Sequence, residues 1–382
     1  MARVQEFYKG RRKRRNLAII PFIVLLLLVS LVLVLFYGMQ KYAVITKDGV
    51  TVELPILMDE NAKVDELGHE IRELEQTTAE IVFEQADYSD IEPTAGKGLS
   101  GVRAIFVPAE NISHDELVAY SSRLVSGNAL LLEMKPRSGV PMWYTNATLA
   151  QMYGIGPMST EANSIQEYVK MLKEQGVYLV AQISCCVDET LPSRTIAYCL
   201  QTNMRGLYRD EAGTWLDPYN PDVREYVAQM AQELFDMGFD EVVLADVAHP
   251  ALEATEDGSE NPEQFIYTTE ISTQRSAVNA VCGFALSVAE KLSNREGVLS
   301  IYLDSRTALV KPDTQTGQDG ELFLKVFDRA YIKTDKYAYP YNADDIKPRV
   351  YIGSVYDRLV PVVENYIPSD NSSWILIDVE EE

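Results

Sequence analysis

Acidic side chains stand at the carboxyl ends of several apolar runs in this sequence. Asp246 follows a run that begins at Glu241, and Asp304 ends the next such run along the chain. If these runs form parallel strands of one sheet, their carboxyl ends meet at the same edge. The polar residues at or just past such ends are Glu133, Lys135, Asp188, Asp246, His249, Asp304, Arg306, Lys333, Asp335 and Asp378. Several carboxylates would therefore converge on one site.

Two carboxyl groups held close together can carry out glycoside hydrolysis. One carboxylate acts as nucleophile or base, while a carboxylic acid protonates the leaving oxygen. We expect Asp246 and Asp304, on neighbouring strands, to take these two catalytic roles, with Glu133 and Asp188 positioning the substrate. The other polar residues expected to bind substrate are Lys135, Asp217, His249 and Asp378. The alternative is that these side chains are polar only because strand ends meet solvent in any barrel.

Aromatic side chains could supply the apolar part of a sugar site. Carbohydrate rings have apolar faces that stack on aromatic faces, while their hydroxyls pair with polar groups. The four candidates are Trp143, Tyr144, Trp215 and Tyr219. The alternative is that these rings pack in the core. This alternative fits Trp215 better than Trp143, which lies in a proline-rich loop.

Other kinds of site find little support. The chain has 3 His without paired spacing and 4 Cys, of which Cys185 and Cys186 are adjacent, and this fits no structural zinc site. We expect buried thiols on a core strand, and a bridge from Cys199 or Cys282 to one of them stays open. Phosphate-binding glycine motifs are missing, and the net charge of −23 disfavours nucleic acid as a partner. The sequence therefore predicts no cofactor and no metal.

Short apolar runs alternate with helical patterns from residue 101 onward. The expected strands are 102–107, 129–134, 177–184, 241–246, 298–304, 330–334, 349–355 and 374–379. The expected helices are 113–126, 164–175, 222–237 and 269–293. Eight strands that are apolar on both faces and joined by helices indicate a (β/α)8 barrel over 99–382. A doubly wound open sheet is the alternative, because the connections around 313–321 and 339–348 look like loops.

Two consecutive segments resemble a known family. Trp215-Leu216-Asp217-Pro218-Tyr219 precedes an expected helix, and Gly238-Phe239-Asp240-Glu241 opens the strand that leads to Pro250. They resemble the glycosyl hydrolase-like domain family of bacterial barrel proteins, distant relatives of the α-amylase-type barrels. The likeness extends back through 133–139 and 178–182, so it covers about 101–250. It implies a (β/α)8 barrel whose mouth acts on carbohydrate.

The sequence departs from the pattern of that family at the presumed site. Where the family has aspartate followed by tyrosine, valine, arginine, phenylalanine and proline, this chain reads Ala245-Asp246-Val247-Ala248-His249-Pro250. The acid has moved by one position, the arginine is missing, and Gln182 and Val187 replace an arginine and a lysine. Because strand side chains alternate faces, the shift would turn Asp246 away unless a bulge restores it. The chain is thus either an active hydrolase or a catalytically silent barrel that binds glycan or a partner protein.

The N-terminal region carries a membrane signal. A basic tail, 1–16, ends at Arg11-Arg12-Lys13-Arg14-Arg15, directly before an uncharged apolar run, 17–37, that is long enough to span a bilayer. The run has no small-residue cleavage site, so it indicates an uncleaved anchor. The positive-inside rule then places the tail in the cytoplasm. We expect a single-pass cell-membrane protein whose main domain lies outside and acts on or binds polysaccharide or cell-wall glycan.

Residues 38–98 are expected to connect the anchor to the barrel. The runs 44–46 and 50–54 flank Lys47-Asp48-Gly49 and predict a small hairpin. Apolar residues at three- and four-residue spacing over 64–81 predict an amphipathic helix. This helix could pair two copies as a short coiled-coil dimer, pack on its own domain, or take the place of the last barrel helix.

Overall fold

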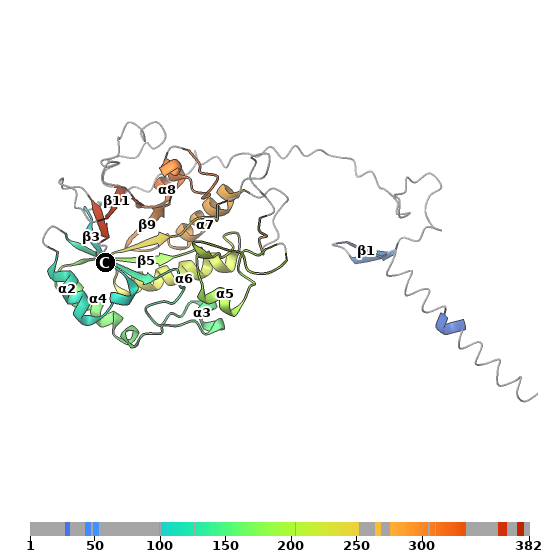
Figure 1. Cartoon of the computed structure of the whole chain (residues 1–382), viewed down its shortest axis with the longest axis horizontal. Coiled ribbons are helices and arrows are strands. Elements are labelled where there is room, and N and C mark those ends of the chain that lie inside the picture. Colours follow the sequence, from blue (N-terminus) through green and yellow to red (C-terminus); the bar gives the residue numbers. More distant parts are fainter. Residues whose placement is uncertain are drawn as a thin grey trace, which may run out of the picture. The chain divides into compact units, whose positions relative to one another are not determined.

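The computed structural model covers most of the predicted barrel and short pieces of the N-terminal region (Figure 1). The described residues are 27–30, 43–46, 49–52, 99, 101–124, 127–202, 204–251, 264–268, 276–304, 306–309, 311–333, 358–364 and 373–377. The chain divides into two compact units, Met1–Glu84 and Gln85–Glu382.

The first unit contains the predicted hairpin. Strands β1 (Ala43–Thr46) and β2 (Gly49–Val52) pair antiparallel, which confirms the prediction. Of the expected span 17–37, the structure describes only 27–30, which are helical. Among the described residues, no helix combines the length and the apolar character needed to cross a bilayer. The expected amphipathic helix 64–81 lies outside the described residues.

The second unit is a closed barrel of eight parallel strands. In chain order these are β3 (Arg103–Val107), β4 (Ala129–Lys135), β5 (Tyr178–Ser184), β8 (Glu241–Ala245), β9 (Val298–Leu303), β10 (Arg329–Lys333), β11 (Leu359–Glu364) and β12 (Trp374–Ile377). They are neighbours in this same order, and β12 pairs with β3 to close the barrel. Closure confirms the (β/α)8 fold class and rules out the open sheet.

Helices cover the outside of the barrel (Figure 1). The longer ones are α2 (His114–Ser122), α4 (Ile165–Glu174), α6 (Pro221–Met237), α7 (Ala277–Lys291) and α8 (Gly320–Val326). The connections also contain η3 (Ala109–Asn111), α3 (Thr148–Tyr153), η4 (Thr160–Asn163), α5 (Thr190–Arg194), β6 (Arg209–Asp210), β7 (Gly213–Thr214) and η5 (Arg306–Leu309). Helix α6 is capped at both ends, because the Asn220 side chain accepts a hydrogen bond from Asp222 N and Gly238 takes the left-handed conformation.

Side chains fill the barrel interior at the amino-terminal ends of the strands. Glu241 is fully buried there and accepts hydrogen bonds from Ser300 Oγ (2.5 Å), Tyr331 OH (2.6 Å) and Tyr178 OH (3.0 Å). Arg329 Nη1 lies 3.4 Å from the same carboxylate. Apolar interior side chains continue this packing, among them Leu131, Val180, Val243, Val360 and Ile375. The barrel is therefore a packed core rather than a pore.

The prediction for the seventh strand is wrong. The place between β10 and β12 belongs to β11, not to 349–355, which lies outside the described residues. Pro361 stands in the middle of β11, and proline argues against a central strand because it has no N–H to donate. Its neighbours Leu359, Val360, Val362 and Val363 are buried. Each buried aliphatic side chain contributes about 1.5–3 kcal/mol against about 1 kcal/mol for a hydrogen bond, so burial decides.

Two helices also differ from the sequence prediction. Helix α8 begins at Gly320, within a segment expected to be a loop, and the side chain of Asp319 caps it by accepting from Glu321 N. Helix α7 begins at Ala277 rather than 269, after the capping residue Ser276. Residues 269–275 lie outside the described part of the chain.

Candidate active site

A pocket of about 330 Å³ opens at the carboxyl ends of the barrel strands. All eight strands or the residues just after them contribute to it. Its polar lining residues are Glu133, Arg137, Gln182, Ser184, Asp246, Tyr302, Asp304 and Lys333. Phe106, Leu131, Ala245, Leu303, Val362, Ile375 and Ile377 complete the wall. Three of the predicted site residues, Glu133, Asp246 and Asp304, are thus brought together at the end of the barrel where such folds carry their active sites.

Asp246 faces the pocket because of its backbone conformation. It follows the last residue of β8 and has a φ of 52°, in the left-handed region that aspartate tolerates better than most residues. The sequence suggested that a one-residue shift would turn this side chain away unless a bulge restored it. The left-handed residue restores the direction instead, and it places Asp246 beside Ala245 in the pocket wall.

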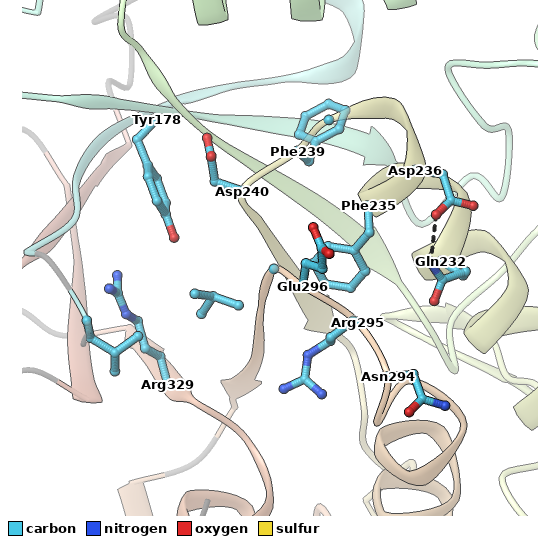
Figure 2. A pocket seen from close by; sticks show the side chains of 14 residues that line it. Tyr178, Gln232, Phe235, Asp236, Phe239, Asp240, Asn294, Arg295, Glu296 and Arg329 are labelled. Carbon is cyan, nitrogen blue, oxygen red and sulfur yellow. Dashed lines mark hydrogen bonds between the residues drawn. The ribbon is translucent and has the colours of Figure 1, made fainter. Parts of the chain in front are cut away.

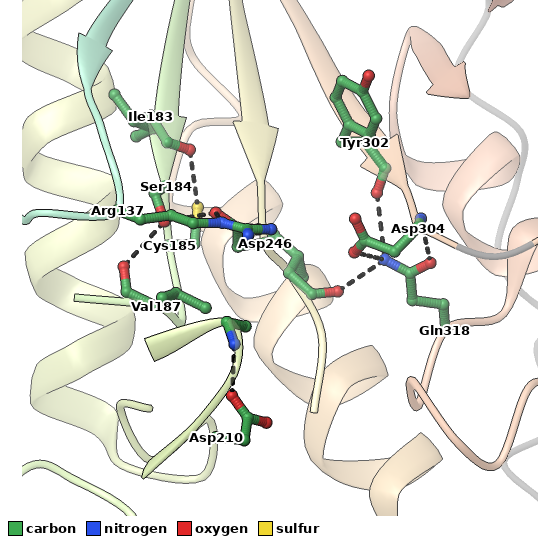
Figure 3. Close-up of polar contacts among 12 residues, drawn as sticks. Arg137, Ile183, Ser184, Cys185, Val187, Asp210, Asp246, Tyr302, Asp304 and Gln318 are labelled. Atoms are coloured by element: carbon green, nitrogen blue, oxygen red, sulfur yellow. Dashed lines mark hydrogen bonds and ion pairs between the residues drawn. The ribbon is translucent and has the colours of Figure 1, made fainter. Parts of the chain in front are cut away.

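Arg137 and Ser184 hold the Asp246 carboxylate (Figure 3). Arg137 donates from Nη2 to Oδ1 at 2.5 Å and from Nε to Oδ1 and Oδ2 at 3.0 and 3.1 Å. Ser184 Oγ lies 2.6 Å from Oδ2. Donors on both oxygens fit the ionised form of the carboxylate. Arg137 follows Lys135-Pro136 at the end of β4, and its position just past a strand end was the signal that sequence reasoning did not use.

Asp304 has a different environment on the next strand. Gln318 Nε2 donates to its Oδ2 at 2.9 Å, and its backbone N donates to Gln318 Oε1 at 2.9 Å (Figure 3). Desolvation by the surrounding protein, and secondarily the charge of Asp246, raises the pKa of Asp304 to about 7, against the opposing effects of Arg137 and Gln318. The carboxyl group is still open to solvent in the pocket, which moderates the desolvation. Asp304 can therefore hold a proton near neutral pH.

Glu133 is the third carboxyl group of the pocket. Its Oε2 accepts a hydrogen bond from Ala109 N at 3.2 Å. Burial first, and then the charges of Glu110 and Asp246, raises the pKa of Glu133 above its usual value. Its neighbour across the β4–β5 ladder is Gln182, so a carboxyl and an amide stand side by side in the wall, where they could bind sugar hydroxyls.

Lys135 and Asp188 pair with each other outside the pocket lining. The β4–β5 register shifts between Glu133 and Lys135, so two side chains that regular alternation would place on one face are separated. Lys135 Nζ lies 2.8 Å from Asp188 Oδ2, donates to Ser184 O at 2.8 Å and faces the ring of Tyr226. Both charged side chains are almost fully buried, with 1% and 0% exposed.

The chain approaches Asp188 closely from two sides. Oδ1 accepts from Thr190 N and Leu191 N, both at 2.8 Å, at the start of α5. Gly139, with a φ of +78°, faces the same carboxylate, and a Cβ at this position would lie 2.0 Å from Oδ1. Only glycine fits there. The ion pair therefore ties the end of β4 to the start of α5.

Lys135→Met is expected to lower the free energy of unfolding by about 3–5 kcal/mol, because it leaves the buried Asp188 charge without its partner. Lys173→Met is the matched control. Lys173 pairs with Asp240 at 2.5 Å, but the two side chains are 39% and 24% exposed, so its loss should change stability by less than about 1 kcal/mol. Urea unfolding followed by circular dichroism measures both. Equal effects of the two variants would contradict the structural role of the Lys135–Asp188 pair.

Asp217 and His249 are buried and line no part of the pocket. Asp217 Oδ1 accepts from Tyr219 N at 2.9 Å, and Oδ2 accepts from Thr268 N and Oγ1 at 2.8 Å. His249 contacts Tyr267 OH through Nε2 at 2.6 Å and Pro250 O through Nδ1 at 2.9 Å. Burial lowers the pKa of His249 to about 4, so the imidazole is neutral at pH 7. Both residues fix the loop that follows β8.

The aromatic candidates also lie outside the pocket lining. Trp215 is buried in the core, and Tyr219 OH donates to Ser276 O at 3.1 Å. Trp143 and Tyr144 line a separate groove on the outer surface. The side chain of Arg306, and residues Asp335 and Asp378, lie outside the described part of the chain. Lys333 pairs with Glu364 at 2.7 Å on the pocket wall.

The described cysteines are all buried and free, so no bridge links Cys199 or Cys282 to Cys185 or Cys186. The expectation of buried thiols is confirmed. Within the described ranges, no group of three or more His, Cys, Asp and Glu side chains could hold a metal ion.

A larger cavity of about 710 Å³ lies at the opposite end of the strands (Figure 2). The cavity is lined by the end of α6 and by residues at the starts of strands, namely Tyr178, Asp240, Val298 and Arg329. Three of its charged groups, Asp240, Arg295 and Arg329, take part in structural ion pairs, such as Arg295 Nη2 with Asp328 Oδ2 at 2.7 Å. This end of a (β/α)8 barrel serves stability rather than catalysis, so the smaller pocket is the better candidate.

The chain is distantly similar to several solved structures. A hypothetical protein from Ruminiclostridium thermocellum is 19% identical, with a TM-score of 0.43 over 52% of this chain and 96% of that one. The glycoside hydrolase domain of PgaB (BpsB) from Bordetella bronchiseptica is 14% identical, with a TM-score of 0.49 over 73% of this chain and 94% of that one. No curated protein matches the sequence. Residues 104–342 match the family described as "Putative glycosyl hydrolase domain", and the chain belongs to this family.

Proposed function

We propose that the barrel hydrolyses glycosidic bonds, with Asp246 as the ionised carboxylate and Asp304 as the general acid. The observation that carries this proposal is that both carboxyl groups line one pocket in opposite environments. Asp246 receives donors on both oxygens. Desolvation, with the negative charge of Asp246 beside it, raises the pKa of Asp304 to about 7. A pair of titratable groups whose surroundings separate their protonation states is what acid–base catalysis requires.

The other pocket residues have supporting roles in this proposal. Glu133 and Gln182 bind sugar hydroxyls from the wall between β4 and β5. Arg137 holds the Asp246 carboxylate in place until substrate enters. Its side chain is 56% exposed, so it can also move to contact a ligand. Asp304 protonates the leaving oxygen, and Asp246 attacks the anomeric carbon or activates a water.

A second candidate function is glycan binding without hydrolysis. The ion pair with Arg137 favours it, because the guanidinium occupies both oxygens of the Asp246 carboxylate. The pocket of about 330 Å³ also lies at the small end of the range for ligand sites. In this case substrate would bind, but no group would attack its anomeric carbon.

Release of reducing ends from polysaccharides separates these two functions. The full chain is incubated with neutral and cell-wall glycans, and Asp246→Asn serves as the control for contaminating activity. Hydrolysis by the wild type and not by the variant supports the enzyme. Binding of the same glycan with no release by either protein would support the silent barrel and reject the enzyme.

The proposed location is the outer face of the cell membrane. The basic cluster Arg11–Arg15 and the uncharged run 17–37 support a single-pass anchor with a cytoplasmic tail, 1–16. The polysaccharide or cell-wall glycan would then meet the barrel outside the cell. Protease added to intact cells should remove a C-terminal epitope and leave an N-terminal one. Protection of the C-terminal epitope would show that the proposed topology is wrong.

A further inference from the structure

A second groove, of about 450 Å³, lies on the outer surface of the barrel domain. We call it the Tyr144 groove. It is lined by Trp143, Tyr144, Asn146, Ala162, Asn163, Ile165, Gln166, Glu233, Asp236 and Met237. These residues come from the β4–α3 connection, the region where η4 leads into α4, and the end of α6. None of them lines the catalytic pocket.

Tyr144 presents its ring to solvent from a backbone that is fixed on both sides. Its side chain is 62% exposed, whereas Trp143 is 3% exposed. Trp143 Nε1 donates to Glu233 Oε2 at 2.8 Å, and Asn146 N donates to Glu233 Oε1 at 2.7 Å. Gln151 Nε2 donates to the carbonyl of Thr145, the intervening buried residue, at 2.6 Å. The aromatic side chain is therefore held ready before any ligand arrives.

The polar groups of the groove suit sugar hydroxyls. Asn146, Asn163 and Gln166 are exposed amides, and each amide offers both donors and an acceptor. Glu233 and Asp236 add acceptors and negative charge, and the described lining residues include no Lys, Arg or His. This charge disfavours phosphates, acidic polysaccharides and nucleic acid. An exposed aromatic ring with amides around it is the combination that binds a neutral pyranose chain.

We propose that the Tyr144 groove is a second carbohydrate site that holds a neutral polysaccharide to the outside of the barrel. The inference takes from the proposed function only the class of ligand, a glycan. A sugar ring stacks on Tyr144, and hydroxyls of the chain pair with the amides of Asn146, Asn163 and Gln166. The groove thereby keeps polymer near the protein whether or not a bond is being hydrolysed.

Affinity electrophoresis of the full chain tests this site. Every protein carries Asp246→Asn, so that no polymer is hydrolysed, and each gel contains starch, xylan, mannan, hydroxyethyl cellulose or the acidic polymer alginate. One of the neutral gels should retard the parent protein. In that gel, adding Tyr144→Ala should weaken retention by about three- to tenfold, the usual effect of one stacking contact. Tyr144→Phe should retain binding because it keeps the ring. Met152→Ala, which removes another side chain that is 62% exposed, should have no effect.

Equal retention of the Tyr144→Ala and parent proteins would overturn the inference. The inference would also fail if none of the neutral polymers retarded the parent protein, or if alginate alone did. An equal loss of retention in the Met152→Ala variant would likewise contradict it. The result is independent of catalysis: if retention depends on Tyr144 but the wild type releases no reducing ends, the groove stands and the proposed hydrolase does not. If the wild type hydrolyses glycan but retention does not depend on Tyr144, the proposed hydrolase stands and the second carbohydrate site does not.

Discussion

Asp246→Asn is expected to lower kcat/KM for glycan hydrolysis by about 10⁴-fold, at the upper end of what one positioned acid, base or nucleophile contributes. Asparagine has nearly the same size, its Oδ1 can still accept from Arg137, and its NH2 group can donate to Ser184 Oγ in place of the bond that Oδ2 accepted. It cannot attack an anomeric carbon or take a proton from water. The loss should therefore appear in kcat, measured as release of reducing ends, with little change in thermal stability.

Glu133→Gln is the matched control for this prediction. Glu133 lines the same pocket and undergoes the same carboxyl-to-amide change, but its expected role is to bind hydroxyls. Its loss should raise KM more than it lowers kcat. If Asp246→Asn keeps more than a tenth of the activity while Glu133→Gln does not, the essential carboxylate is Glu133. The anomeric configuration of the first product, followed by NMR, then shows whether Asp246 acts as nucleophile or as base.

The barrel could be predicted from the sequence because its strands are apolar on both faces. Runs such as 177–184 and 241–246 match β5 and β8 within a residue at each end. The same reasoning failed at β11, where Pro361 interrupts the apolar run. Propensity argues against a strand there, and only the buried neighbours in the closed barrel reverse it.

The candidate site was predicted only in part, because side-chain direction depends on local backbone irregularities. The left-handed conformation of Asp246 and the register shift in β4 are each a change of a single residue. The first turns Asp246 into the pocket, and the second separates Lys135 from Glu133. A one-residue change exchanges the two faces of a strand, and apolar periodicity alone does not locate it.

The sequence also did not predict which side chains from distant loops contact Asp246 and Asp304. Arg137 is 109 residues from Asp246 along the chain, and Gln318 approaches Asp304 from the connection before α8. Neither belongs to a motif with a fixed spacing, so the closed barrel is needed to bring them together. The sequence lacks an arginine directly after Asp246, and in the structure Arg137, from a different strand end, contacts the Asp246 carboxylate.

Asp304→Asn is expected to reduce kcat/KM by about 10²–10⁴-fold for natural glycans, whose leaving groups need a proton. The pH dependence supplies the sharper test. Because desolvation by the surrounding pocket and the charge of Asp246 raise the pKa of Asp304 to about 7, the wild type should be active below this pH and lose activity above it. The variant should lack this alkaline limb. A substrate with an activated leaving group such as 2,4-dinitrophenol, which departs without a proton, should restore most of its rate.

Stability distinguishes this catalytic role from a structural one. A raised carboxyl pKa in the folded state means that Asp304 favours folding while protonated, and that this contribution is lost as pH rises through about 7. Asparagine carries no charge to desolvate, so at pH 8 the variant should unfold at the same temperature as the wild type or at a higher one. Gln318 can still hydrogen-bond the new amide, which preserves the local contact. A variant that loses activity and also melts earlier at pH 8 would show that Asp304 supports the fold rather than donates the proton.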